Sequence, residues 1–192
     1  MLSRNLQSAL IDWTVQHSGH VNRRACIGLS QIGESETDLV RGYFLGVERQ
    51  VSEHLKFRLS FEMEDKLVER LGDMGVYSPG EEISLFGGLV QGHTDGVIER
   101  SDILEIKTVP LESHLPENGR VSSKIYWQVQ AYMHYLKRNW THVLYLARES
   151  GMIRVVGVEY KPEIGARIEA KLEQVVAAVM EGALPVEIEP ER

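Results

Sequence analysis

In the first half of the chain, hydrophobic residues recur every three or four positions, which is the spacing of an amphipathic helix. Three such segments stand out, and we expect one helix over residues 3–16, a second that follows Gly33, and a third over residues 53–71. Gly72 follows the third segment as a stop signal. The apolar positions of the three segments are Leu6, Leu10 and Trp13, then Leu39, Val40, Tyr43 and Phe44, then Leu55, Leu59, Met63, Leu67 and Leu71.

The pattern changes after residue 81 to short, β-branched segments interrupted by glycine, which favours strands. We expect strands within residues 82–99, 102–109, 141–147 and 153–160. Helical spacing returns over residues 122–139 and 162–180, the latter with Pro162 near its start, and residues 183–192 form a loose tail. This order predicts an α/β fold, with a mixed central β-sheet flanked by helices on both faces.

The composition is that of an ordinary folded protein and narrows its class. With 192 residues, 43% apolar and 26% charged, we expect one domain over residues 1–192, with its core at about 27–180. The sequence contains no run of eighteen apolar residues, so we expect no membrane span. Its start lacks the features of a signal peptide. Because Cys26 is the only cysteine, the chain can form neither an intrachain disulfide nor an iron–sulfur cluster on several thiolates. A cytoplasmic location is the default expectation.

Charge is distributed unevenly along the chain. The net charge is −7, yet residues 118–148 contain no Asp or Glu and carry five bases, interleaved with tyrosine and tryptophan. The five bases are Arg120, Lys124, Lys137, Arg138 and Arg148. A basic aromatic segment is typical of a phosphate-binding surface. The same residues also suit a solvated helix with core aromatics, so both interpretations remain open.

The segment "DILEIKTV" combines an apolar and a charged face. Side chains alternate along a strand, so Leu104 and Ile106 share one face while Glu105 and Lys107 share the other. A hairpin centred on residue 100 would place Asp95 opposite Glu105, with Cβ atoms about 4.5–5.5 Å apart. Two such carboxylates repel unless a cation compensates, and a hard divalent ion does so well. The alternative is an ordinary exposed strand face.

These residues resemble a known signature. Asp95, followed after nine residues by Glu105-Ile106-Lys107, resembles the motif of the PD-(D/E)XK nucleases. Downstream, "YWQVQAYMHYL" carries Gln128 and Tyr132, which resembles the Gln-x-x-x-Tyr motif of the RecB-type and lambda-exonuclease-type (YqaJ-like) branch. The resemblance covers about residues 27–180 and implies a restriction-endonuclease-like core.

By this resemblance, the site binds Mg²⁺ or Mn²⁺ and no iron–sulfur cluster. The implied metal ligands are Glu64, Asp95, Glu105 and the backbone carbonyl of Ile106. Glu62 and His54 remain alternatives to Glu64, since Ser60 stands where relatives often have glycine and leaves the alignment of that helix open. His93 would share the face of Asp95 as a supporting or surface residue.

The other implied roles concern the attacking water and the DNA. Lys107 would position the water, and Gln128 and Tyr132 would orient Lys107 or contact the DNA backbone, with a core position as the alternative for Tyr132. The expected DNA-binding residues are Arg120, Lys124, Trp127, Lys137 and Arg138, while Trp140 is expected in the core at the start of a strand. Arg23, Arg24 and Arg41 are candidates for a terminal phosphate.

The implied function is a metal-dependent deoxyribonuclease, an exonuclease of phage or bacterial DNA recombination or repair. Its expected partner is the end of linear DNA, and the same branch suggests a single-strand annealing protein and further copies of the chain, but no membrane. Two other classes remain open. One is a catalytically inactive nucleic-acid-binding or scaffold subunit with the same fold, and the other is an acidic structural protein without a DNA partner.

Overall fold

The computed structural model describes residues 26–45, 51–98 and 101–182, without the side chains of residues 51–59. The helix expected over residues 3–16, the tail at 183–192, and Arg23 and Arg24 lie outside this part of the chain. The helices are α2 (Glu36–Leu45), α3 (Val51–Asp73), α4 (Ser123–Leu136) and α5 (Pro162–Glu181). Short 3₁₀ turns are η1 (Leu29–Gln31), η2 (Phe86–Gly88) and η3 (Glu112–His114).

The main sheet has five strands in the order β2-β5-β6-β7-β8. They are β2 (Tyr77–Pro79), β5 (Gly96–Ile98), β6 (Asp102–Val109), β7 (Trp140–Ala147) and β8 (Ile153–Glu159). Strands β6 and β7 are parallel, and the other neighbours are antiparallel. A parallel pair needs a long crossover, and α4 provides it between β6 and β7. This confirms the predicted mixed sheet.

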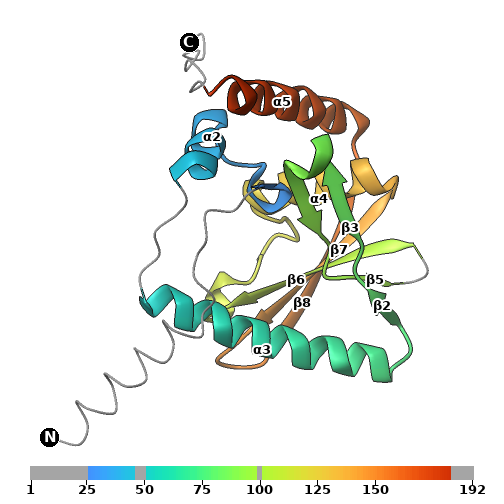
Figure 1. Cartoon of the computed structure of the whole chain (residues 1–192). Coiled ribbons are helices and arrows are strands. Elements are labelled where there is room, and N and C mark those ends of the chain that lie inside the picture. The colour runs from blue at the N-terminus through green and yellow to red at the C-terminus, as the bar shows by residue number, and fades with distance from the viewer. Residues whose placement is uncertain (1–25, 46–50, 99–100, 183–192) are drawn as a thin grey trace, which may run out of the picture.

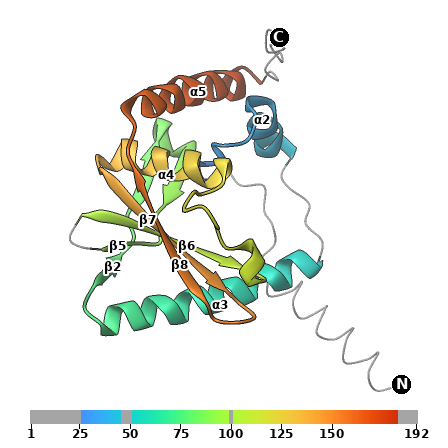
Figure 2. The same cartoon turned by 180° about the vertical axis from the view of Figure 1, so that it is seen from behind.

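Helices cover both faces of the main sheet, as the two opposite views show (Figures 1 and 2). On one face, Leu104 and Ile106 of β6 pack with Leu144 and Leu146 of β7 under α3. The partners from α3 are Met63, Leu67, Val68 and Leu71, so the C-terminal half of the predicted apolar stripe is partly buried against the sheet. The opposite face forms the larger core with α4, α5 and α2.

Residues 82–98 form a second sheet as well as part of the first, which the strand pattern did not predict. Strands β3 (Glu82–Leu85) and β4 (Val90–His93) pair with β1 (Ile27–Gly28) in the order β1-β4-β3. The η2 turn separates β3 from β4, and Gly87 and Gly88 adopt positive φ there, a conformation that glycine adopts readily. The chain then passes from β4 into β5 of the main sheet through Thr94 and Asp95 alone.

Most expected boundaries agree with the structure to within a few residues. Helix α4 ends before residue 139 because Lys137 takes a left-handed conformation and its backbone N–H caps the carbonyl of Met133. Pro162 occupies the first turn of α5, as expected. Trp140 begins β7, but the prediction that it is a core residue is wrong, since 44% of it is exposed. Among the described helices, none is long and apolar enough to cross a membrane.

Candidate active site

The passage between the two sheets fixes the backbone of Asp95. Thr94 is fully buried, and its hydroxyl accepts a hydrogen bond from the Glu81 N–H at 2.9 Å. The Tyr77 hydroxyl donates to the carbonyl of Asp95 at 2.9 Å. Tyr77 lies so close that a Cβ at Gly96 would be 2.2 Å from its ring. Glycine at position 96 therefore allows the contact that holds Asp95.

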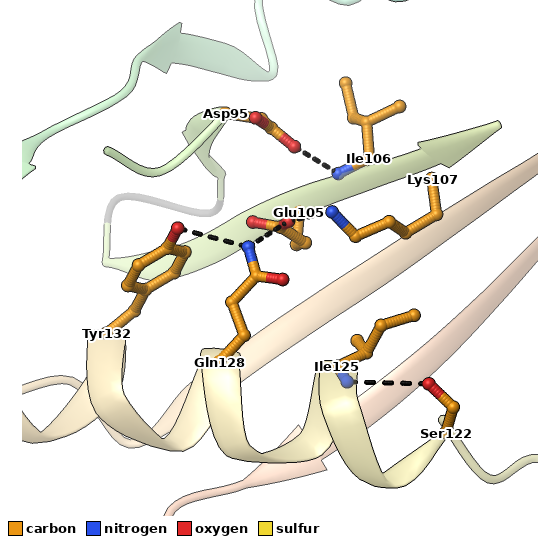
Figure 3. A network of polar contacts seen from close by, with 8 residues as sticks. All are labelled: Asp95, Glu105, Ile106, Lys107, Ser122, Ile125, Gln128 and Tyr132. Atoms are coloured by element: carbon orange, nitrogen blue, oxygen red, sulfur yellow. Dashed lines mark hydrogen bonds and ion pairs between the residues drawn. The ribbon is translucent and has the colours of Figure 1, made fainter. Parts of the chain in front are cut away.

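The β5–β6 hairpin has the predicted register. Gly96 pairs with Leu104 and Ile98 with Asp102, so the hairpin is centred on residue 100. Asp95, the residue before Gly96, therefore lies opposite Glu105. Its carboxylate Oδ2 accepts a hydrogen bond from the Ile106 N–H at 2.6 Å (Figure 3). Burial raises the pKa of Asp95, although this hydrogen bond and the positive charge of Lys107 oppose the shift.

Glu105 is the most deeply buried charged group of the site. It is 1% exposed, and its Oε1 accepts hydrogen bonds from Lys107 Nζ at 2.5 Å and Gln128 Nε2 at 2.6 Å (Figure 3). The other oxygen, Oε2, is buried without a hydrogen-bond partner in the described part of the chain. Burial raises the pKa of Glu105 to about 7, and Lys107 limits the rise. A buried carboxylate oxygen without a partner is costly, which indicates that a ligand completes this site.

Lys107 connects the buried carboxylate to the pocket. Its side chain is partly exposed and lies beside Glu105 on the same face of β6. Burial acts to lower the pKa of Lys107, but the carboxylates of Glu105, Asp95 and Glu64 outweigh it, so the pKa is raised. The ammonium group therefore stays charged where acids gather.

Helix α4 supplies the two residues of the Gln-x-x-x-Tyr motif. Ser122 caps its start by accepting a hydrogen bond from the Ile125 N–H (Figure 3). Gln128 and Tyr132 lie one turn apart and are both buried, and Gln128 Nε2 donates to Glu105 and to the Tyr132 hydroxyl, the latter at 3.1 Å. Gln128 thus contacts Glu105 instead of orienting Lys107 directly. Tyr132 is at once a core residue and a wall of the pocket.

Of the three upstream candidates, Glu64, Glu62 and His54, the structure places Glu64 at the site. It lines the pocket, and its pKa is raised to about 7 by burial and by the nearby charge of Asp95, with Lys107 opposing. Glu62 is exposed and does not line the pocket. The side chain of His54 lies outside the described residues.

These groups surround a single cavity of about 840 Å³ at the junction of the two sheets, α3 and α4. A cavity of this size is ample for a small organic ligand. Besides the residues above, its lining includes Cys26, Gly28, Ser30, Ser60, Phe61, Glu82, Ile83, Ser84, Gln91, Gly92, His93 and Thr108. His93 is exposed at this lining, which agrees with its expected place beside Asp95.

The donor set of the cavity suits a hard divalent cation. Within residues 26–45, 60–98 and 101–182, no three acidic, histidine or cysteine side chains already converge as a metal site. Four carboxyl groups nevertheless line the cavity, those of Glu64, Glu82, Asp95 and Glu105. The pKa values of Glu64, Asp95 and Glu105 are raised, and one buried oxygen of Glu105 lacks a partner among the described residues. Mg²⁺ and Mn²⁺ prefer such oxygen ligands. The residues present therefore fit the expected ion.

The five residues expected to bind DNA do not line the cavity. Lys124 pairs with Glu34 at 2.7 Å, and Arg138 pairs with Glu81 at 2.6 Å. Trp127 packs under Arg167, whose guanidinium lies 5.1 Å from the ring centroid. Arg120 and Lys137 are exposed away from this lining, and Arg41 lies 3.9 Å from Asp38 on α2. Much of the basic stretch therefore serves packing and ion pairs within the fold.

Several pocket residues were not singled out from the sequence, among them Phe61 and Gln91, and Ser60 was not expected to line the pocket. Phe61 and Ser60 precede Glu64 by three and four residues, the spacings that share a helix face. This spacing was the available signal for both. Gln91 carries no comparable signal, because only the β3–β4 pairing directs it to the cavity.

Comparison with solved structures identifies the fold. LHK-Exo, an alkaline exonuclease from Laribacter hongkongensis, matches in a complex with dAMP with a TM-score of 0.64 and 14% identity, over 84% of this chain and 91% of that one. A second structure of LHK-Exo gives 0.59 and 13% identity, over 83% and 90%.

A phage-related exonuclease from Haemophilus somnus 129PT gives a TM-score of 0.58 at 10% identity, over 78% of this chain and 81% of that one. No model of a known protein family and no curated protein matches the sequence. The likeness is thus one of structure, and it agrees with the order of the sequence motifs. The chain has the PD-(D/E)XK fold of these exonucleases.

Proposed function

We propose that this protein is a metal-dependent deoxyribonuclease, and specifically an exonuclease that hydrolyses phosphodiester bonds at the ends of linear DNA. The observation that carries the proposal is the buried Glu105 carboxylate, which has one oxygen without a partner and the other paired with Lys107. Asp95 and Glu64 complete an acidic cavity around it. An ordinary exposed strand face would have no reason to bury these charges together.

The residues that would hold Mg²⁺ or Mn²⁺ are Glu64, Asp95, Glu105 and the backbone carbonyl of Ile106. When bound, the ion would polarise the phosphodiester and lower the pKa of water. The protein's own part is to keep Glu105 in place, through the hydrogen bond from Gln128, which is itself bonded to Tyr132. Such outer hydrogen bonds orient metal ligands and tune their basicity.

Lys107 is the residue we propose to act on the reacting groups. Its ammonium remains charged and reaches the cavity from the same face as Glu105. From there it would donate a hydrogen bond to the attacking water and stabilise negative charge that builds on the phosphate. The choice of an exonuclease rests on the described activity of the structural neighbours, LHK-Exo and the phage-related enzyme. A role in phage or bacterial recombination or repair is part of the same proposal.

The test is digestion of end-labelled linear, circular and single-stranded DNA, with Mg²⁺ and with excess chelator. We expect degradation of linear DNA from its ends only with the metal, and no cutting of circles. Cutting of circles would show an endonuclease. Binding without any cutting would instead favour an inactive nucleic-acid-binding subunit.

Lys107→Ala provides the matched variant for this test. Removing a group that stabilises transition-state charge typically lowers the rate by about 100- to 1,000-fold. Lys66→Ala is the control, because Lys66 is an exposed lysine of α3 that pairs with Glu69 at 3.0 Å and does not line the cavity. Undiminished activity in Lys107→Ala, with the fold intact by circular dichroism, would count against the proposed mechanism.

A further inference from the structure

The cavity extends beyond the carboxylates along α3 and the end of β6. The lining continues from Glu105 through Lys107 to Thr108 on the strand, and from Glu64 back to Phe61 and Ser60 on the helix. Neither the metal ligands nor Lys107 accounts for this part of the pocket. Two features in and beside this part of the pocket point to a ligand.

The first feature is an exposed aromatic ring in a polar pocket. Phe61 lines the cavity and is 60% exposed, although burying a phenylalanine side chain would stabilise the fold. Other exposed aromatic residues, such as Phe86 and Trp140, do not line the cavity. Phe61 lies three residues before Glu64, so the two side chains are neighbours on the helix surface. An exposed ring beside phosphate chemistry is a surface on which a nucleobase stacks.

The second feature is Arg148, which does not itself line the cavity but contacts the lining residue Ser60. Arg148 is partly buried, its backbone N–H donates to the carbonyl of Val109 at 2.8 Å, and its Nη1 donates to the Ser60 hydroxyl at 3.1 Å. No described carboxylate lies within ion-pair distance of it, unlike Arg138, which pairs with Glu81. A partly buried guanidinium with donors to spare is well suited to a phosphate.

We infer that Phe61 and Arg148 form a subsite for the nucleotide adjoining the scissile phosphate, with its base stacked on Phe61 and a backbone phosphate bound by Arg148. This inference rests on the proposed nuclease function. A base can stack on Phe61 only when it is not stacked in a duplex, so the subsite takes a single-stranded or frayed strand end. Ser60 positions Arg148 through their hydrogen bond.

The experiment for Phe61 measures the affinity of short oligothymidylates for the Lys107→Ala protein in Mg²⁺, where the proposed cleavage is blocked. A single abasic residue is moved along the strand. Phe61→Ala should weaken binding of the intact strand by about 5- to 100-fold. Phe61→Ala should not change the affinity for the strand whose abasic residue occupies the subsite, because that strand has no base to stack on the ring. Phe61→Trp should retain the affinity, and Phe86→Ala, which removes an exposed ring elsewhere, should leave it unchanged.

The experiment for Arg148 uses the salt dependence of the same binding. Each phosphate contact to a single strand contributes about 0.7 to the slope of log affinity against log salt concentration. Arg148→Ala should lower the slope by that amount, Arg148→Lys should restore it, and Arg70→Ala on the outer part of α3 should not change it. A merely structural role of Arg148 would not alter this slope.

The outcomes separate the inference from the proposed function. If the protein cuts DNA but Phe61→Ala loses affinity equally at every abasic position, or the salt slope stays constant in Arg148→Ala, the subsite is wrong and the nuclease assignment stands. If the parent protein neither binds nor cuts DNA, both fall. Base-dependent loss together with the reduced slope establishes the subsite.

Discussion

At the scale of single residues, the site is organised around Glu105. Its Oε1 accepts hydrogen bonds from a cation and from an amide, while Oε2 stays buried without a partner in the described chain. Gln128 uses both donors of its amide, one to Glu105 and one to Tyr132. The arrangement prepares one carboxylate for a positive ligand, because its orientation is set before any ligand arrives.

Gln128→Leu tests this orientation. The substitution leaves Glu105 paired with Lys107 alone, and losing an outer partner of a metal ligand typically costs about 10- to 100-fold in metal affinity or activity. We therefore expect a higher Mg²⁺ concentration for half-maximal nuclease activity. Gln174→Leu on α5, which is exposed, is the control. An unchanged Mg²⁺ requirement would show that Gln128 serves packing only.

The raised pKa of Glu64 predicts a pH-dependent stability in the metal-free protein. Its folded pKa of about 7 exceeds the ordinary value of 4.5, so the folded state binds the proton more tightly. That stabilisation is fully present below pH 4.5 and is lost as the pH rises through 7. Glu64→Gln should thus raise the melting temperature at pH 8 more than at pH 4.5 in chelator, by about 2–4 °C.

Glu69→Gln is the control for this pH dependence. Glu69 lies on the same helix, but its hydrogen bond with Lys66 lowers its pKa. Its removal should not stabilise the protein at pH 8. Equal shifts for Glu64→Gln at both pH values would contradict the linkage.

At the scale of secondary-structure elements, the short connection between β4 and β5 controls the site. Thr94 and Asp95 carry the chain from one sheet to the other, while Tyr77 of β2 holds the Asp95 carbonyl. Helix α3 has a divided role, since its C-terminal half packs on β6 and β7 while Ser60, Phe61 and Glu64 face the cavity. The same helix therefore supplies packing from one part and cavity residues from another.

Gly96→Ala tests the connection. The added Cβ would meet the Tyr77 ring at 2.2 Å, so the ring must shift and its hydrogen bond to Asp95 weakens. We expect a loss of about 1–3 kcal/mol in unfolding free energy, together with lower nuclease activity. Gly72→Ala in α3 meets open space and should stabilise the helix by up to about 1 kcal/mol. Denaturant titration measures the unfolding free energy of both variants, and a nuclease assay measures their activity. Unchanged stability and activity in Gly96→Ala would show that the contact with Tyr77 does not hold Asp95.

At the scale of the whole molecule, the fold joins acids from three places in the chain. Glu64 comes from α3, Asp95 from the connection between the sheets and Glu105 from β6 (Figure 1). Only folding brings these like charges into one cavity, which costs stability until a cation compensates. The metal binding proposed above would thus be coupled to folding.

The coupling predicts that Mg²⁺ stabilises the native protein. At about 100 times the dissociation constant, a ligand that binds only the folded state adds about 2.7 kcal/mol. We expect the melting temperature at pH 8 to rise with Mg²⁺, and the rise to be lost in Asp95→Asn. Asp73→Asn, which changes an exposed acid at the end of α3, should keep it. A rise of equal size in both variants would place the ion elsewhere.

Local patterns in the sequence were sufficient for much of the fold. Alternation along residues 102–109 separated the face of Leu104 and Ile106 from that of Glu105 and Lys107. The hairpin centre assumed at residue 100 agrees with the observed register. Helical spacing located α4 and put Gln128 and Tyr132 on one side. These features depend on neighbours a few residues apart, so the sequence alone determines them.

Only the tertiary structure decided how the segments meet. The division of residues 82–98 between two sheets depends on pairing with β2 and with β1, and β1 lies far away in the sequence. The choice of Glu64 over Glu62, and the partner of Gln128, depend on the rotation of α3 and α4 against the sheet. Arg138 and Lys124 carry the same charge in any fold, but contacts with Glu81 and Glu34 engage them in internal ion pairs. Local periodicity carries no information about such long-range partners, because packing selects them.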